Sequence, residues 1–231
     1  MNNNTPPAAD QLTVLPKCHD PVRILRRDKD FLLIEKPAGL LSVPGRNPAN
    51  HDCVASRLQL EYPTVSIVHR LDFDTSGIMV VALNKPAHAK IARQFQERQT
   101  FKLYYAVVAG GPPEQSGVIN LPIAPDAENR PKCKIDPEGK PSVTHYKVLA
   151  FDEALNRSLV ALEPKTGRSH QLRLHMAHLG CPILGCEFYA PEATRALADR
   201  LLLHASELRF THPHDDSEVS GVAERPFWRS I

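Results

Sequence analysis

The sequence predicts an α+β fold in a single large domain. Segments with the patterns of β-strands outnumber segments with helical periodicity, and the two kinds do not alternate as they do in chains built of βαβ units. The chain has 231 residues, of which 42% are hydrophobic, so it can bury a substantial core. Residues 1–20 are polar and proline-rich, and we expect a tail there, followed by one domain over residues 21–231.

The first half of the chain contains four segments with clear patterns. Residues 78–83 form a short, β-branched apolar run, which is typical of a buried strand. Ile91 and Phe95 lie four residues apart, as on one face of a helix. The predicted elements of this half are strands over 31–35, 78–83 and 102–109 and a helix over 87–98.

In the second half, proline and glycine separate the elements. Residues 110–117 contain Gly-Gly-Pro-Pro and a further glycine, which indicates a turn. Residues 125–141 contain four prolines and several charges, and we expect a long functional flap there. Gly180 is suited to end a helix. The predicted elements are strands over 143–151, 158–162, 201–203 and 208–210 and a helix over 169–179.

Charge and cysteine content limit the possible functions. The formal net charge is only +2, so a nucleic-acid site would have to be a local basic patch. The five cysteines form no Cys-x-x-Cys pair, which favours reduced thiols in a cytoplasmic protein. No secretory signal is visible, and apolar runs of about six residues are far shorter than the ~20 residues that span a bilayer. We expect a cytoplasmic protein without membrane contact, and a monomer by default.

The most informative segment runs from His69 to Gly77. It places a carboxylate, a guanidinium, an imidazole and two hydroxyls directly before a predicted buried strand. Polar side chains on a loop that is fixed to a rigid strand are often used for catalysis. Asp72 is therefore a candidate nucleophile or base. The alternative for such an aspartate is that it caps a turn through Thr75 or Ser76.

Four motifs give the chain a resemblance to a known family, and they agree in order and spacing from about residue 28 to about residue 213. They are His69-Arg70-Leu71-Asp72 with Thr75-Ser76-Gly77, the Lys36–Gly45 segment, Lys102-Leu103-Tyr104-Tyr105-Ala106, and the Gly167–His175 segment continued by Leu179-Gly180, Pro182–Gly185 and Tyr189. The chain resembles the RluA-type pseudouridine synthases, which isomerise uridine in RNA by detaching the base and rejoining it through carbon. The resemblance implies the pseudouridine synthase fold, a central mixed and largely antiparallel sheet with a cleft across it, and an isomerase without cofactor or metal.

The resemblance also implies a class of substrate. Many family members begin with a small RNA-binding module of the S4 type, and we expect none here because the first motif starts near residue 30. The compact form most resembles the subgroup that modifies tRNA anticodon stem-loops and a hairpin of large-subunit rRNA. We therefore expect tRNA, rRNA or both as RNA partners.

Roles for individual residues follow from the same resemblance. Asp72 is implied to be the catalytic aspartate and Arg173 its partner, since an arginine within about 4–6 Å holds a carboxylate ionised. Tyr104 matches the active-site tyrosine, whose ring can stack on a base and whose hydroxyl can relay a proton. Arg70 is implied to occupy the space left by a uridine that is rotated out of its helix.

Two further residues near Asp72 have more than one interpretation. His69 either bonds the displaced RNA backbone or braces the loop as a structural histidine. Asp74 lies two residues after Asp72 and would point to the opposite side of an extended segment, so we expect it in solvent or in a local turn. Tyr105 is expected on the other face of its strand from Tyr104, where it would pack.

Basic residues provide candidate phosphate contacts, which add affinity but do not identify a base. The strongest segment is 129–134, which is basic inside the long flap. The candidate phosphate-binding residues are Lys36, Arg46, Arg130, Lys132, Lys134, Lys140, Lys165 and Arg168. The full set of expected substrate-binding residues is His69, Arg70, Thr75, Arg130, Lys132 and Arg168.

A different interpretation is a zinc site, because imidazoles and thiols are zinc ligands. The spacing of the histidines and cysteines between residues 170 and 186 matches no common zinc finger, and the pseudouridine synthase family is not expected to need a metal. The chain also departs from the family at Cys186, where Gly-Asp is usual, and at Cys181. Two alternatives to a pseudouridine synthase are a non-catalytic RNA-binding protein that keeps the cleft and a zinc-dependent nucleotide enzyme. The candidate ligands are His170, His175, His178, Cys181 and Cys186.

Overall fold

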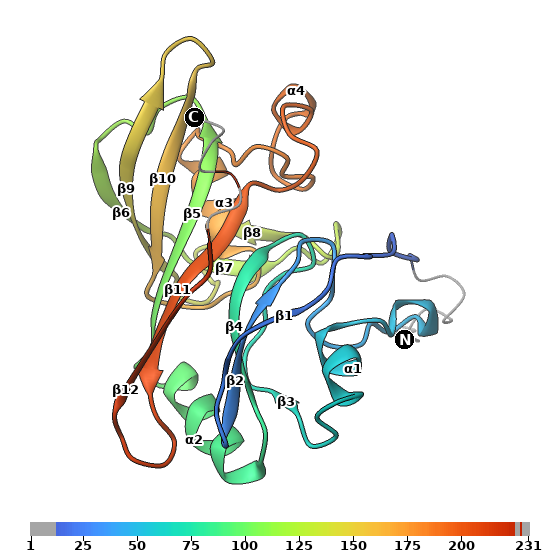
Figure 1. The fold of residues 1–231 in the computed structure, drawn as a ribbon. Helices are drawn as coiled ribbons and strands as arrows, with labels where there is room; N and C mark the ends of the chain where they lie inside the picture. The colour runs from blue at the N-terminus through green and yellow to red at the C-terminus, as the bar shows by residue number, and fades with distance from the viewer. Residues whose placement is uncertain (1–12, 225–226, 228–231) are drawn as a thin grey trace.

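The computed structural model describes residues 13–224 and residue 227 (Figure 1). In this part of the chain, one ten-stranded sheet has the order β1-β2-β4-β11-β5-β10-β9-β6, with β3 paired to β4 and β12 paired to β11. β7 and β8 form a separate hairpin. Helices α1, α2 and α3 accompany the sheet without regular alternation, which confirms the α+β prediction.

The strands of the large sheet are β1 (Arg23–Arg27), β2 (Phe31–Lys36), β3 (Ser66–Ile67), β4 (Ser76–Ala82), β5 (Phe101–Ala109), β6 (Ser116–Asn120), β9 (Val143–Asp152), β10 (Arg157–Pro164), β11 (Leu203–Thr211) and β12 (Glu218–Val222). The hairpin consists of β7 (Ile123–Pro125) and β8 (Cys133–Ile135). The helices are α1 (Val54–Gln59), α2 (Lys85–Gln96), α3 (Gln171–His178) and α4 (Glu192–Arg195), with a 3₁₀ turn η2 at Pro48–Asn50.

One pair of strands in the middle of the sheet differs from the others. β4 and β11 run parallel, and Gly77 of β4 lies opposite Ala205 of β11. Every other pair in the described sheet is antiparallel. The sheet is therefore mixed and largely antiparallel, as the resemblance implied.

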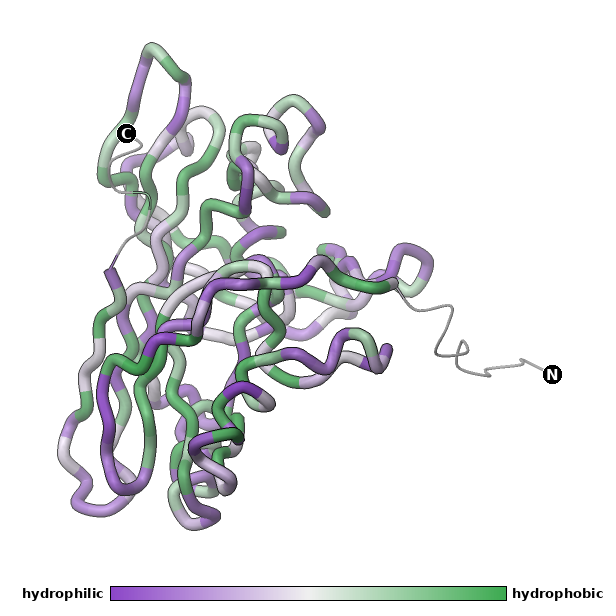
Figure 2. Tube along the Cα trace, turned by 45° about the vertical axis from the view of Figure 1, so that its right-hand side comes forward, coloured by the Kyte–Doolittle hydropathy of each residue, from purple (hydrophilic) through white to green (hydrophobic). Residues whose placement is uncertain are grey.

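Two hydrophobic clusters fill the molecule. The first surrounds β2 and β4, where all seven residues of β4 are buried and Ile91 of α2 packs against them. The second lies between β5, β9, β10 and α3, which contributes Leu172 and Met176. Tyr104 packs against both clusters. In Figure 2 the hydrophobic colour follows the strands, whereas the turns at the bottom of the view are hydrophilic.

Most predicted elements are present, with differences at their ends. The helix predicted over 87–98 spans Lys85–Gln96, because the Asn84 side chain accepts the Ala87 N–H and caps its start. The two late strands predicted over 201–203 and 208–210 are wrong as separate elements, since Leu203 and residues 208–210 belong to the single strand β11 and residues 201–202 precede it. The flap predicted over 125–141 contains β8 and the turn of the β7–β8 hairpin.

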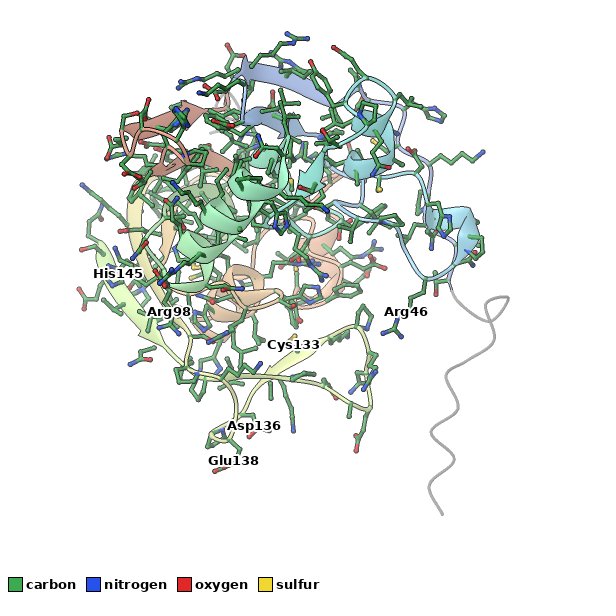
Figure 3. The ribbon with its side chains drawn as sticks, turned by 90° about the horizontal axis from the view of Figure 1, so that it is seen from below. Arg46, Arg98, Cys133, Asp136, Glu138 and His145 are labelled. Carbon is green, nitrogen blue, oxygen red and sulfur yellow. The ribbon has the colours of Figure 1, made fainter. Side chains whose placement is uncertain are left out.

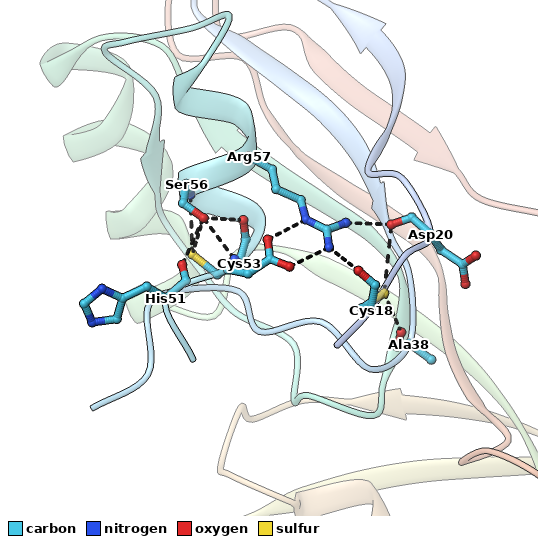
Figure 4. A network of polar contacts seen from close by, with 8 residues as sticks. Cys18, Asp20, Ala38, His51, Cys53, Ser56 and Arg57 are labelled. Atoms are coloured by element: carbon cyan, nitrogen blue, oxygen red, sulfur yellow. Dashed lines mark hydrogen bonds and ion pairs between the residues drawn. The ribbon is translucent and has the colours of Figure 1, made fainter. Parts of the chain in front are cut away.

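The last part of the predicted N-terminal tail lies against the domain. The Asn50 side chain both accepts from and donates to the backbone of residues 13–15. Arg57 on α1 donates to the carbonyls of Cys18 and Asp20 (Figure 4). Residues 1–12 of the tail lie outside the described residues. None of the described helices is long and apolar enough to cross a membrane.

The close approach of β4 and β11 depends on Gly77. Its φ is +124°, and an added Cβ would lie 2.1 Å from the Ala205 carbonyl oxygen. Gly110 provides a matched control, because its φ is +70° but nothing lies within 4 Å of an added Cβ. Both positions have a positive φ, but +124° lies further from the left-handed region that alanine tolerates, and the steric clash is specific to Gly77.

We expect Gly77→Ala to lower the free energy of unfolding by about 3 kcal/mol or more, since backbone strain and overpacking add. Gly110→Ala should cost only the strain of a left-handed alanine, about 1–2 kcal/mol. Urea unfolding followed by circular dichroism measures both. Equal losses in the two variants would contradict the importance of this contact.

Candidate active site

Asp72 lies at the start of a tight turn that leads into β4. The turn spans residues 72–75, and the Thr75 N–H donates to the Asp72 carbonyl at 3.2 Å. At its centre, the Phe73 carbonyl accepts from the Gly39 N–H at 2.9 Å and from the Lys36 ammonium at 3.1 Å. Hydrogen bonds to backbone carbonyls therefore fix the turn at its start and at its centre.

Lys36 has a different role from the one predicted. Its side chain is 0% exposed, and its ammonium donates to the carbonyls of Pro37, Leu40 and Phe73. Burial lowers the pKa of this ammonium to about 7, although the nearby Asp72 and Asp74 act to raise it. The prediction that Lys36 binds phosphate is wrong, because the group is enclosed by protein. Its position at the end of the apolar strand 31–35 was the signal for burial.

Arg173 of α3 is 2% exposed and directs its guanidinium at this turn. Its Nη1 lies 3.7 Å from Asp72 Oδ2, and its Nε donates to the Cys186 sulfur at 3.4 Å. The rings of Phe188 and Tyr189 cover it, with ring centroids 4.9 and 5.8 Å from the guanidinium carbon. Arg173 is therefore held on several sides while one arm faces Asp72.

Asp74 lies in a local turn, as predicted, but the prediction that it points to the opposite side from Asp72 is wrong, because it faces the same guanidinium. Its Oδ2 is 3.6 Å from Arg173 Nη2, and its side chain is 28% exposed, compared with 23% for Asp72. The prediction assumed an extended segment. Because residues 72–75 form a turn, the two carboxylates lie on one side.

Tyr104 lies on β5 between Leu162 of β10 and Ala205 of β11. Burial raises the pKa of its phenol far above the usual value, and the nearby Asp72 carboxylate acts in the same direction. The hydroxyl therefore remains protonated at neutral pH. Tyr105 points away and packs against the cluster that contains Val107 and Leu159, as predicted.

Asp72, Tyr104 and Arg173 together line one open cleft. One wall comes from the turn before β4, the floor from β5, and the other wall from the segment that leads into α3. The lining residues are Arg70, Leu71, Asp72, Thr75, Lys102, Tyr104, Pro164, Thr166, Gly167, Arg168, Ser169, His170, Gln171, Leu172, Arg173 and Leu203.

Three of the six predicted substrate-binding residues line this cleft. Arg70 is exposed, Thr75 is buried, and Arg168 is half-buried with its Nε 3.4 Å from the Pro141 carbonyl. Arg130 and Lys132 instead lie in the turn of the β7–β8 hairpin, outside the cleft lining. In Figure 3 this hairpin stands away from the body of the molecule.

His69 braces the loop. Its Nε2 accepts the Val80 N–H at 3.0 Å, and its ring stacks on Phe95 with centroids 4.2 Å apart. Burial lowers the pKa of His69 to about 3, with Lys102 acting in the same direction, so the ring is neutral. These contacts favour the structural interpretation of His69 over contact with RNA.

Several lining residues were not assigned to the site by sequence reasoning, and Lys102 and His170 are the titratable ones among them. Lys102 lines the cleft, and burial, with Arg98 and Lys165 nearby, lowers the pKa of its ammonium to about 8. His170 begins α3 with a left-handed φ of 56°, and its Nδ1 lies 2.7 Å from the Tyr189 hydroxyl. Lys102 lies in the Lys102–Ala106 motif and His170 in the Gly167–His175 motif. Membership of these motifs was the sequence signal that could have placed both residues in the site.

The candidate ligands of the alternative zinc site are not gathered in the described part of the chain. Both ring nitrogens of His175 have other partners, the Thr144 hydroxyl and the Leu121 carbonyl. Cys186 accepts from Arg173, and Cys181 is buried. In the described part of the chain, three potential ligands come together only at Asp28, Asp30 and His212, away from these residues.

Comparison with known proteins identifies the family. The family model described as RNA pseudouridylate synthase matches residues 30–178. The chain is 48% identical to the dual-specificity RNA pseudouridine synthase RluA of Escherichia coli K12 (88% of this chain, 93% of the relative). It is 49% identical to that of Yersinia pestis (88% and 99%) and 50% identical to that of Vibrio parahaemolyticus (82% and 78%).

Solved structures agree with these sequence matches. Human RNA Pseudouridylate Synthase Domain Containing 1 superposes with a TM-score of 0.78 at 32% identity, covering 93% of this chain and 88% of that chain. Human RNA Pseudouridylate Synthase Domain Containing 4 gives 0.72 at 29% identity, with 88% of each chain covered. The predicted pseudouridine synthase fold is confirmed. This chain belongs to the RNA pseudouridylate synthase family, and it is an isomerase that converts uridine in RNA to pseudouridine.

Proposed function

We propose that this enzyme acts on structured RNA, on tRNA anticodon stem-loops and on a hairpin of large-subunit rRNA, with Asp72 as its catalytic carboxylate. Its relatives at 48% and 50% identity are named dual-specificity RNA pseudouridine synthases, which supports more than one RNA substrate. The enzyme works in the cytoplasm as a monomer and needs no cofactor. The observation that supports the mechanism most is the meeting of Asp72, Tyr104 and Arg173 in one cleft.

Asp72 is suited to the central step. Breaking the glycosidic C–N bond develops positive charge at the sugar, and a carboxylate is needed as nucleophile or as counter-charge. Arg173 lies 3.7 Å away and holds Asp72 by one arm only. The base, once detached, must turn within the cleft before carbon replaces nitrogen at the sugar, so the site has to retain it throughout.

Tyr104 is suited to retain the detached base. Its ring lies in the cleft floor, where it can stack on a flat uracil, and its hydroxyl is a protonated donor close to Asp72. A new carbon–carbon bond at the ring also requires loss of a proton from that carbon. The phenol can relay this proton through its hydroxyl.

A uridine inside a stem-loop reaches Asp72 only after it has rotated out of the stack. Arg70 is exposed at the cleft lining, where a flat guanidinium can fill the vacated space. Lys102 and Arg168 also line the cleft and can contact the phosphates on either side of the extruded nucleotide. Arg130 and Lys132 on the hairpin would extend this contact along the RNA.

We expect Asp72→Asn to abolish pseudouridine formation on both an anticodon stem-loop and an rRNA hairpin, a loss of at least about 10³-fold. RNA binding should persist, because the amide keeps the shape of the side chain. Carbodiimide mapping of the product and an electrophoretic mobility shift assay measure the two properties. Normal turnover by this variant would remove Asp72 from the mechanism. Loss of RNA binding together with turnover would instead assign Asp72 to substrate binding.

Tyr104→Phe separates the ring of the tyrosine from its hydroxyl. We expect a fall in the single-turnover rate of about 10²-fold, which is the usual contribution of a proton-relaying group, with RNA affinity unchanged. Tyr105→Phe is the matched control on the other face of β5 and should keep the wild-type rate. An unchanged rate in Tyr104→Phe would limit Tyr104 to stacking.

Arg130→Gln and Lys132→Gln test the hairpin contacts. Each should reduce the slope of log K against log salt by about 0.7–0.9 and leave the rate at saturating RNA unchanged, because phosphate contacts release counterions. Lys29→Gln is the control, since Lys29 precedes β2 at the end opposite Lys36. If the hairpin and control variants have the same slope as the wild type, the hairpin does not contact phosphate.

A further inference from the structure

Two carboxylates share the guanidinium of Arg173. Asp72 faces Nη1 at 3.7 Å and Asp74 faces Nη2 at 3.6 Å, while Nε donates to Cys186. Nη2 is buried and has no hydrogen-bond partner among the described residues, so the Asp74 carboxylate supplies the charge that faces this arm. All three nitrogens of the fork thus have a separate neighbour.

The backbone fixes Asp74 in this place. The Phe73 carbonyl, in the peptide unit between Phe73 and Asp74, accepts from Lys36 and from Gly39. These two hydrogen bonds fix the orientation of the turn, so that the carboxylates of Asp72 and Asp74 both face α3. Asp74 itself is absent from the lining of the cleft, whereas Asp72 and Arg173 belong to it. Asp74 therefore does not contact a bound nucleotide, and any effect on the reaction must pass through Arg173.

The alternative arrangement of Arg173 is a bidentate one. An arginine fork prefers two parallel hydrogen bonds to a single carboxylate, and such a pair is strong. A guanidinium that closed on Asp72 with both arms would occupy both oxygens of the catalytic carboxylate. With Nη2 facing Asp74, only one arm is available to Asp72, and the second oxygen of Asp72 remains free for the sugar.

We propose that Asp74 is a positioning residue, whose ionised carboxylate keeps one arm of Arg173 away from Asp72 and so preserves the reactivity of Asp72. The inference rests on the proposed catalytic role of Asp72. It requires Asp74 to be charged, so that activity depends on two carboxylates, although only one of them touches the substrate.

The surroundings of Asp74 make its charge sensitive to pH. Burial raises the pKa of this carboxyl, and Glu187 and Asp72 act in the same direction, whereas Arg173 and Lys36 oppose them. As pH falls, Asp74 is therefore neutralised earlier than an ordinary aspartate, and the arm facing it is released. The charged groups around it, from every element packed against the turn, are Lys36, Asp72, Arg173, Glu187 and Arg200.

The test is the pH dependence of the single-turnover rate on an anticodon stem-loop. In the wild type, the acid side of the rate profile should contain a step of about 5–10-fold where Asp74 is neutralised, because protonation removes the same charge as Asp74→Asn. Asp74→Asn should lower the rate at pH 8 by about 5–10-fold, with KM within twofold of the wild type, and its profile should lack this step. Asp74→Glu, which keeps the charge, should recover most of the rate.

Glu187→Gln is the matched control, because it removes an exposed carboxylate that influences Asp74 without an ion pair to Arg173. It should keep the wild-type rate at pH 8 and the acid step. A wild-type profile without the step, or an Asp74→Asn variant with the wild-type rate and profile, would overturn the inference, and the first result does not depend on any variant folding. Turnover by Asp72→Asn would instead overturn the proposed function, so the two failures are distinguishable.

Discussion

The buried guanidinium of Arg173 connects the two parts of the molecule that form the active site. Arg173 belongs to α3, which packs on β9 and β10, while its carboxylate partners lie in the turn before β4. Removing such a charge from water costs several kcal/mol, and only well-placed partners offset that cost. The aromatic cover of Phe188 and Tyr189 adds cation–π contact and excludes solvent. The geometry of the cleft thus depends on the buried charge of Arg173, which these partners hold in place.

The sheet provides the rigid frame for this interaction. β4 and β11 are parallel neighbours whose backbones approach closely at Gly77, and β5 follows β11 in the strand order. Asp72 is therefore attached to one strand and Tyr104 to another only two places away. Because Tyr104 packs against both hydrophobic clusters, its ring is fixed by the two halves of the core together. Side chains held in this way lose little entropy when a substrate arrives.

Local patterns predicted most of the strands and the helix α3, because period is a property of short segments, and the family resemblance predicted that Asp72, Tyr104 and Arg173 lie together. What they did not predict was set by contacts distant in sequence. The role of Lys36 depends on the carbonyl of Phe73, which is 37 positions away. Asp74 was misplaced because an extended segment was assumed, whereas hydrogen bonds from Lys36 and Gly39 stabilise a turn. The continuity of β11 likewise depends on its pairing with β5, since its own sequence contains the polar residues His204, Ser206 and Glu207.

The hydroxyl of Tyr189 joins the hairpin to the cleft through a single oxygen. It accepts the backbone N–H of Cys133 in β8 at 2.8 Å and lies 2.7 Å from His170 Nδ1. Burial lowers the pKa of His170 and so favours its neutral ring, in which Nδ1 either accepts the Tyr189 proton or donates to the Tyr189 oxygen. Because this one oxygen contacts both groups, a displacement of β8 would be transmitted to the side chain of His170 in the cleft lining.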